Sequence, residues 1–184
     1  MLPFGHLAAG YLVSDAILAA AKPALAPPQL RSLLLWGVFF SFAPDLDFFY
    51  AFAKKRSLTI TGTDVNHRDY WTHRPMLWLG ASLLFAAFAA SPYWRWFGVM
   101  MLAGSWSHFL LDSIRTGVRW LWPFSRRFFA LQAPGAIEAN PVKGFFRHWL
   151  NMIRMYKEKA PLAFYLEIAL VAAAIIKYLT LPSP

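Results

Sequence analysis

Apolar residues are gathered into five long runs, which polar or proline-containing stretches separate from one another. Each run is close to the roughly 20 residues that a helix needs to cross the hydrocarbon core of a bilayer, and the third run is the shortest. The runs extend over Phe4 to Ala21, Leu30 to Ala53, Pro75 to Ala90, Trp96 to Ile114 and Pro161 to Leu181. The pattern predicts an all-α membrane protein with about five transmembrane helices.

The connections between the runs are of two kinds. Lys22 to Pro28 and Ser91 to Tyr93 are short and contain proline, so the first two helices and the next two should form antiparallel hairpins. The other two connections are long and basic. The second of them mixes aromatic and basic residues over Lys143 to Lys159, which predicts an interfacial helix on the membrane surface.

The lysines and arginines predict the orientation in the membrane. With five crossings, the N-terminus and both long loops lie on one side, which carries 14 of the 18 basic residues. Because basic loops are retained in the cytoplasm, we expect a multi-pass inner-membrane protein with its N-terminus inside. Basic loops and anionic lipid also account for the net charge of +9, so membrane lipid is expected as a partner and nucleic acid is not.

Composition agrees with this class of protein. With 58% hydrophobic and 15% charged residues, the chain is too apolar for an ordinary soluble protein. We expect a single domain over 1–184, divided into a core at 1–127, an interfacial loop and helix at 116–160, and a last transmembrane helix at 161–181. The chain has no cysteine, so any metal must be held by nitrogen and oxygen ligands.

The candidate chemistry lies at the cytoplasmic ends of the predicted helices. His108 and Asp112 are four residues apart near the end of the fourth run, so they share one face of a helix about one turn apart. The predicted topology brings further histidines and aspartates to the same side, namely His6, Asp45, Asp47, His67 and His73. Isolated, these residues would be ordinary helix ends, turns and loop positions; together they predict a metal site.

Imidazole and carboxylate ligands favour zinc, iron or manganese. Four histidines and three aspartates exceed what one catalytic ion needs, so we expect two divalent metal ions, with Asp47 as a ligand, a bridge or a nearby base. Arg68 lies between two candidate ligands and has the planar guanidinium that binds phosphate oxygens in pairs, which makes it a catalytic candidate together with Asp47.

The stretch from Asn66 to His73 resembles the His-Arg-Gly-x-Thr-His-Ser signature of a family of inner-membrane, metal-dependent hydrolases described as LexA-binding. The other blocks of that family match in order at His6, at Pro44 to Asp47, and at His108 to Asp112 followed by Leu121 to Ser125. The chain departs from the signature in two places, with Asp69 for glycine and Arg74 for serine. The resemblance implies metal-dependent hydrolysis at the membrane and leaves the substrate open.

Three functions remain open from the sequence. The first is a hydrolase that cleaves a phosphoester or related bond in a lipid or phosphorylated amphiphilic substrate with metal-activated water. The second is a non-enzymatic metal-binding or docking protein for a cytosolic protein partner. The third is a transporter, which would need ionisable residues at the bilayer midplane, where Asp15 and Glu167 are the candidates.

Overall fold

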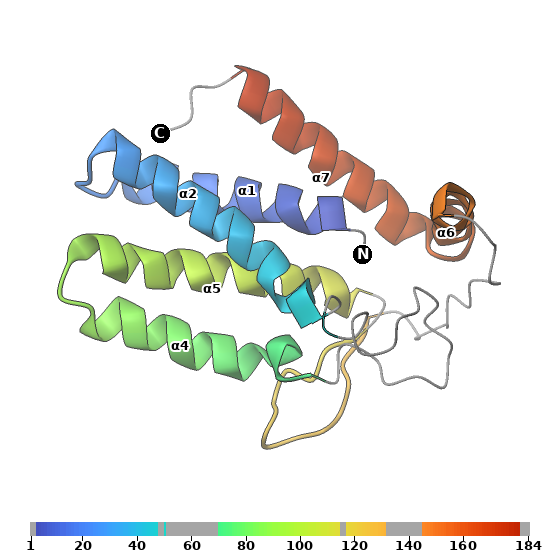
Figure 1. Ribbon diagram of the computed structural model, residues 1–184, viewed down its shortest axis with the longest axis horizontal. Coiled ribbons are helices and arrows are strands. Elements are labelled where there is room, and N and C mark those ends of the chain that lie inside the picture. Colours follow the sequence, from blue (N-terminus) through green and yellow to red (C-terminus); the bar gives the residue numbers. More distant parts are fainter. Residues whose placement is uncertain (1–2, 48–49, 51–69, 115–116, 132–144, 181–184) are drawn as a thin grey trace.

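The computed structural model describes residues 3–47, 50, 70–114, 117–131 and 145–180, and it is a bundle of helices (Figure 1). Its elements in chain order are α1 (Pro3–Ala21), α2 (Pro27–Phe42), the short 3₁₀ turns η1 (Ala43–Leu46) and η3 (Trp71–His73), α4 (Pro75–Phe88), α5 (Pro92–Ser113), α6 (Phe145–Lys159) and α7 (Pro161–Thr180). The part of the chain described here contains no strand beyond one isolated bridge between Val118 and Phe129. The all-α prediction is confirmed.

Prolines set the helix starts. Among the α-helices that the structure describes, all but α6 begin at a proline. Proline is favourable there because its φ angle already suits a helix and because the first N–H of a helix has no partner inside it. For this reason the predicted runs and the observed helices agree within a few residues for α1, α4 and α7. The predicted surface helix also appears, as α6.

Two predicted boundaries were wrong. The second run was expected to begin at Leu30, whereas α2 begins at Pro27 and ends at Phe42, followed by the η1 turn. Pro44 lies in that turn and has no N–H to continue the helical ladder. The predicted end at Ala53 falls outside the described residues. The fourth run was expected to begin at Trp96, but α5 begins at Pro92, where the Ser91 hydroxyl accepts the Trp94 N–H at 3.4 Å.

Helix α5 is central, because it contacts α1, α2 and α4 (Figure 1). Gly104 lies where α5 meets α2, and a side chain there would collide with the α2 backbone. A buried apolar cluster joins these helices, formed by Leu18, Leu33, Leu34, Phe40, Ala43, Phe97, Met100 and Met101. The polar residues with candidate chemistry follow at the end of the bundle where α1 begins and α5 ends.

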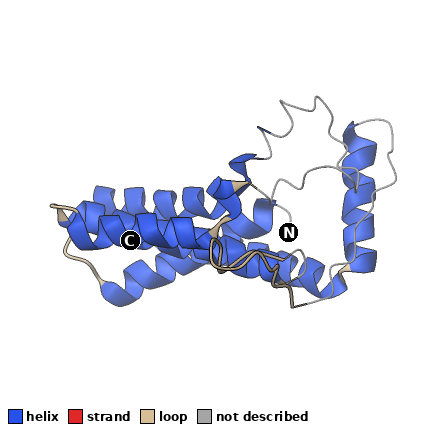
Figure 2. Ribbon diagram, turned by 90° about the horizontal axis from the view of Figure 1, so that it is seen from below, coloured by secondary structure: helices blue, strands red, loops and turns tan. Residues whose placement is uncertain are grey.

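Helices α1 and α7 are the two described helices that are long and apolar enough to cross a membrane, and α4 is apolar but shorter. Crossing by α2, α4 and α5, and the orientation of the bundle, stay predictions. Helix α6 runs across the direction of α7 rather than along it, as the two views together show (Figures 1 and 2).

Two buried carboxylates join α7 to α1. Asp15 is 2% exposed and its Oδ2 lies 2.7 Å from Lys177 Nζ. Glu167 is also buried, and its Oε1 accepts the Gly5 N–H at 3.1 Å, which satisfies one of the free donors at the start of α1. Gly5 allows this close approach, since a Cβ there would lie 2.6 Å from Glu167 Cγ. Both acids therefore contribute to helix packing, which weakens the case for a transporter.

Replacing Lys177 by methionine is expected to destabilise the protein by about 1–3 kcal/mol, because it leaves the Asp15 carboxylate buried without its partner. The double variant Asp15→Leu/Lys177→Met should recover most of that loss, since two apolar side chains replace the pair. Unfolding of the purified protein in detergent measures both. Independent, additive losses in the two single variants would contradict a coupled pair.

Candidate metal centre

Five ionisable side chains from four separate elements meet at one end of the bundle. His6 comes from the first turn of α1, Asp45 from η1, His73 from η3, and His108 with Asp112 from the last turns of α5. They form two groups of three whose nitrogen and oxygen atoms lie within 4.8 Å of one another, and both groups contain His108. Asp45 has a side chain that is 16% exposed, whereas the other four residues are at most 1% exposed, so the centre opens on the Asp45 side.

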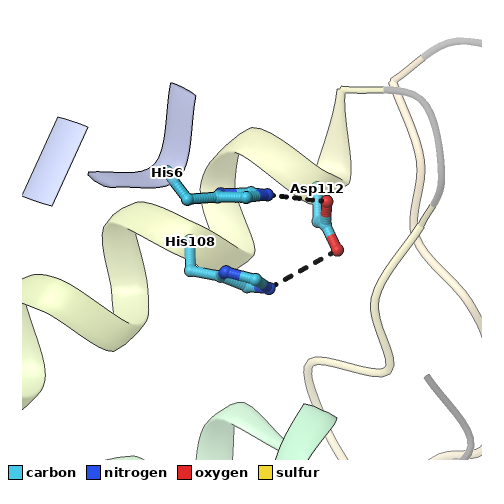
Figure 3. A group of neighbouring side chains, drawn as sticks. All are labelled: His6, His108 and Asp112. Atoms are coloured by element: carbon cyan, nitrogen blue, oxygen red, sulfur yellow. Dashed lines mark ion pairs between the residues drawn. The ribbon is translucent and has the colours of Figure 1, made fainter. Parts of the chain in front are cut away.

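The first group consists of His6, His108 and Asp112. The two imidazole rings are stacked, with centroids 3.9 Å apart, and both direct Nε2 toward the same carboxylate (Figure 3). His6 Nε2 lies 3.5 Å from Asp112 Oδ1, and His108 Nε2 lies 3.7 Å from Asp112 Oδ2. His108 and Asp112 lie on one face of α5, as their spacing of four residues predicts, and α1 adds His6 as a third candidate ligand from far away in the sequence.

The second group consists of Asp45, His73 and His108. Asp45 Oδ1 lies 3.4 Å from His73 Nε2 and 3.7 Å from His108 Nε2, and the two imidazole nitrogens are 3.4 Å apart. Ligands at about 2.1 Å from one tetrahedral ion are separated by about 3.4 Å. The donor atoms of this group thus already have the spacing that a bound ion requires.

Hydrogen bonds at the far side of the rings fix which nitrogen faces the centre. His108 Nδ1 lies 2.9 Å from the Ser41 carbonyl, and His73 Nδ1 lies 2.7 Å from Asp47 Oδ2. Both acceptors are oxygens, so both Nδ1 atoms carry the hydrogen and both Nε2 atoms of the neutral rings present lone pairs. The Nε2 lone pairs of both rings therefore lie near the carboxylates of Asp45 and Asp112, and a divalent cation could bind to such a set of nitrogen and oxygen donors.

Asp47 does not join either group of candidate ligands. Its Oδ2 accepts from His73 Nδ1 and also from the Thr72 hydroxyl in a short hydrogen bond, and the residue is buried. A carboxylate that holds the outer nitrogen of a histidine orients the ring and raises its basicity as a ligand. Of the three roles predicted for Asp47, the structure favours that of a residue next to the ligands over that of a ligand.

Two neighbouring carboxylates raise the pKa of His73. Burial disfavours the imidazolium, but hydrogen bonds to Asp45 and Asp47 and the negative charges of both carboxylates outweigh it and raise the pKa above the usual 6.5. A raised pKa means that a proton competes with a metal ion up to a higher pH. Metal uptake at this position would therefore release a proton and would strengthen as the pH rises through that pKa.

Replacing Asp47 by asparagine is expected to weaken metal binding by about 10- to 100-fold, because the amide orients His73 less firmly and no longer raises its basicity. Competition with a metal-binding dye measures the affinity. Thr72→Val serves as the control, since it removes a hydrogen bond to the same carboxylate and leaves the charge in place. An unchanged affinity in Asp47→Asn would contradict the role of Asp47 in holding His73.

His67 and Arg68 fall outside the described residues. Arg74, which replaces the serine of the resembling signature, is buried, with its guanidinium carbon 5.7 Å from the centre of the Trp122 ring. Sequence analysis missed the Ser41 carbonyl, because a backbone group carries no signal in the sequence. Thr72 lies inside the signature and its position next to His73 was the available clue.

Comparison with curated proteins and with solved structures finds no match. The helical bundle and the histidine and aspartate centre therefore have to be interpreted from this chain itself. A comparison with protein-family models does find a match, which includes every residue of the centre. The model is that of the YdjM inner membrane protein family and it matches residues 1–181, so the chain belongs to this family of membrane proteins.

Proposed function

We propose that this membrane protein is a metal-dependent hydrolase that cleaves a phosphoester or related bond in a lipid or amphiphilic substrate. The observation that carries the proposal is that three imidazoles and two carboxylates form two adjoining groups that share His108, with Asp45 as the partly exposed member. A divalent ion bound there would polarise the substrate and activate water for attack.

The chain's own residues have distinct parts in this proposal. His6, His108 and Asp112 would hold the ion from the buried side, and His73 and Asp45 would complete the set nearer the opening. The single Nε2 of His108 belongs to both groups, and its Nδ1 is engaged by the Ser41 carbonyl, so His108 can serve one ion at a time. A second ion would then depend on Asp45 and His73 with a bridging carboxylate.

The position of the centre supports a lipid or amphiphilic substrate. His6 lies in the first turn of α1, and Glu167, in the second turn of α7, contacts Gly5 next to it. Both of these helices are long and apolar enough to cross a membrane, so the centre lies at the level where they would leave the hydrocarbon. A headgroup could reach the exposed side of Asp45 while its acyl chains stay in the bilayer.

The test is hydrolysis by purified protein that has been stripped with a chelator and reloaded separately with zinc, manganese or iron. Phospholipid vesicles and a soluble aryl phosphate serve as substrates, with release of phosphate or headgroup as the readout. We expect turnover that requires metal and is lost in Asp45→Asn, while Ser107→Ala, whose hydroxyl donates to the Gly104 carbonyl, stays active. A fully metal-loaded protein that hydrolyses neither substrate would favour the metal-binding or docking alternative.

A further inference from the structure

A single residue joins α6 to α7, and the end of α6 packs against the beginning of α7. Tyr156 and Ala160 are buried and pack against Phe164 and Ile114. The Ala160 N–H donates to the Tyr156 carbonyl and the Phe164 N–H to the Ala160 carbonyl, so the backbone bonding continues through the corner. Helix α6 runs across the direction of α7 at the N-terminal end of α7 (Figures 1 and 2). Helix α7 is long and apolar enough to span a membrane.

One face of α6 is an apolar stripe formed by Phe146, Leu150, Ile153 and Tyr156, and the linking residue Ala160 continues it. These positions repeat with the spacing of one helical face. The last two are covered by the base of α7, while Phe146 and Leu150 are 80% and 66% exposed and Ile153 is 38% exposed. The exposed and the covered parts of the stripe are continuous along α6. The exposed part therefore faces the same side of α6 as the part that contacts α7. Helix α7 extends on that side of α6.

The rest of α6 is basic. Its sequence holds four basic residues, Arg147, Arg154, Lys157 and Lys159, against one acid, Glu158. All five are exposed, and Arg154 and Glu158 form an ion pair at 2.9 Å. Lys157 lies within the apolar stripe, four residues after Ile153 and seven after Leu150, where its long aliphatic stem can cover apolar surface while the ammonium reaches outward. Arg147 and Lys159 add further positive charge to the exposed surface of the helix.

We propose that α6 binds the surface of an anionic phospholipid leaflet. The exposed apolar stripe enters the boundary between headgroups and acyl chains, and Arg147 and Lys157 bind the anionic headgroups. The direction of the stripe favours lipid over a soluble protein partner, because the stripe faces the side on which α7 would run through the bilayer. This binding does not depend on the proposed hydrolysis.

The absence of cysteine makes the test direct, because a single introduced thiol carries the only label. Full-length Leu150→Cys and Asn151→Cys proteins, labelled with an environment-sensitive dye, are reconstituted in phosphatidylcholine vesicles and in mixed phosphatidylcholine and phosphatidylglycerol vesicles. At Leu150 we expect a blue shift and loss of most quenching by aqueous iodide, strongest with phosphatidylglycerol. At Asn151, about a quarter turn away toward the polar side, the dye should stay accessible.

Charge variants separate headgroup binding from simple insertion. Arg147→Gln/Lys157→Gln should lose the preference for phosphatidylglycerol, whereas Lys22→Gln/Arg31→Gln, which removes the same charge near the turn between α1 and α2, should keep it. A Leu150 label that is water-accessible in both lipids would overturn the proposal. So would protection that depends on protein concentration and not on lipid, since that result means that another protein copy covers the stripe.

Discussion

His108→Ala is expected to lose the bound metal ion from the purified protein, with metal content falling to background after dialysis. The reason is geometric, because His108 Nε2 belongs to both groups of candidate ligands, 3.4 Å from His73 Nε2 and 3.7 Å from oxygens of both Asp45 and Asp112. His6 and His73 each belong to one group only. Their alanine variants should therefore bind metal more weakly without losing it completely. Elemental analysis of each variant gives the metal content per chain.

Two controls keep this result interpretable. Ser107→Ala changes a buried polar residue on the same turn of α5 and should retain the metal. Added imidazole can occupy the space left by the fully buried His108 ring and should restore part of the metal content. Equal metal content in His108→Ala and in the unmodified protein would exclude the centre as the metal site. The number of ions lost in His6→Ala and in His73→Ala tests the prediction of two ions.

Gly104→Ala is expected to be the most disruptive small substitution in the bundle, with a loss of about 1–3 kcal/mol in the free energy of unfolding. A Cβ at this position would collide with the Gly37 carbonyl and lie 2.9 Å from both Phe40 Cβ and Ser41 N. These neighbours include α2 backbone, which cannot move aside without separating the two helices. The Ser41 carbonyl that fixes His108 would move with α2, so metal affinity should fall together with stability.

Gly80→Ala is the matched control for this prediction. Gly80 lies inside α4, and a Cβ there would meet nothing within 4 Å. Because alanine favours a helix more than glycine does, this variant should be as stable as the unmodified protein or more stable by about 1 kcal/mol or less. Chemical unfolding in detergent and metal titration compare the two variants. Similar losses in both would mean that helix contact at Gly104 is not the cause.

The helices were largely predictable because their signals are local. A run of apolar residues and a proline at its start act through neighbouring residues, and the predicted α7 ends within one residue of the observed helix. In the second run the apolar composition continues past Phe42, whereas the regular helix α2 ends there and Pro44 lies in the following 3₁₀ turn. Hydropathy reports the environment of a segment and does not report where its backbone changes direction.

Five of the seven residues predicted as metal ligands lie together in the structure, whereas His67 falls outside the described residues and Asp47 joins neither group. Lysine and arginine counts placed His6, Asp45, His73, His108 and Asp112 at one end, and the structure brings these five together. The separate role of Asp47 depends on a 2.7 Å contact with His73 Nδ1, which no spacing in the sequence encodes. The roles of Asp15 and Glu167 likewise required knowledge of which helix packs beside α1.

By itself, the sequence determined the helical class, most helix boundaries, the absence of thiolate ligands and a small set of candidate metal ligands. These properties depend on residue type and on neighbours along the chain. Only the tertiary structure decided that His6 and Asp112 lie 3.5 Å apart, that the Ser41 carbonyl directs His108 Nε2 inward, and that α6 turns across the base of α7. The physical reason is that such contacts arise from close packing between helices distant in the sequence, where a single glycine can set the separation.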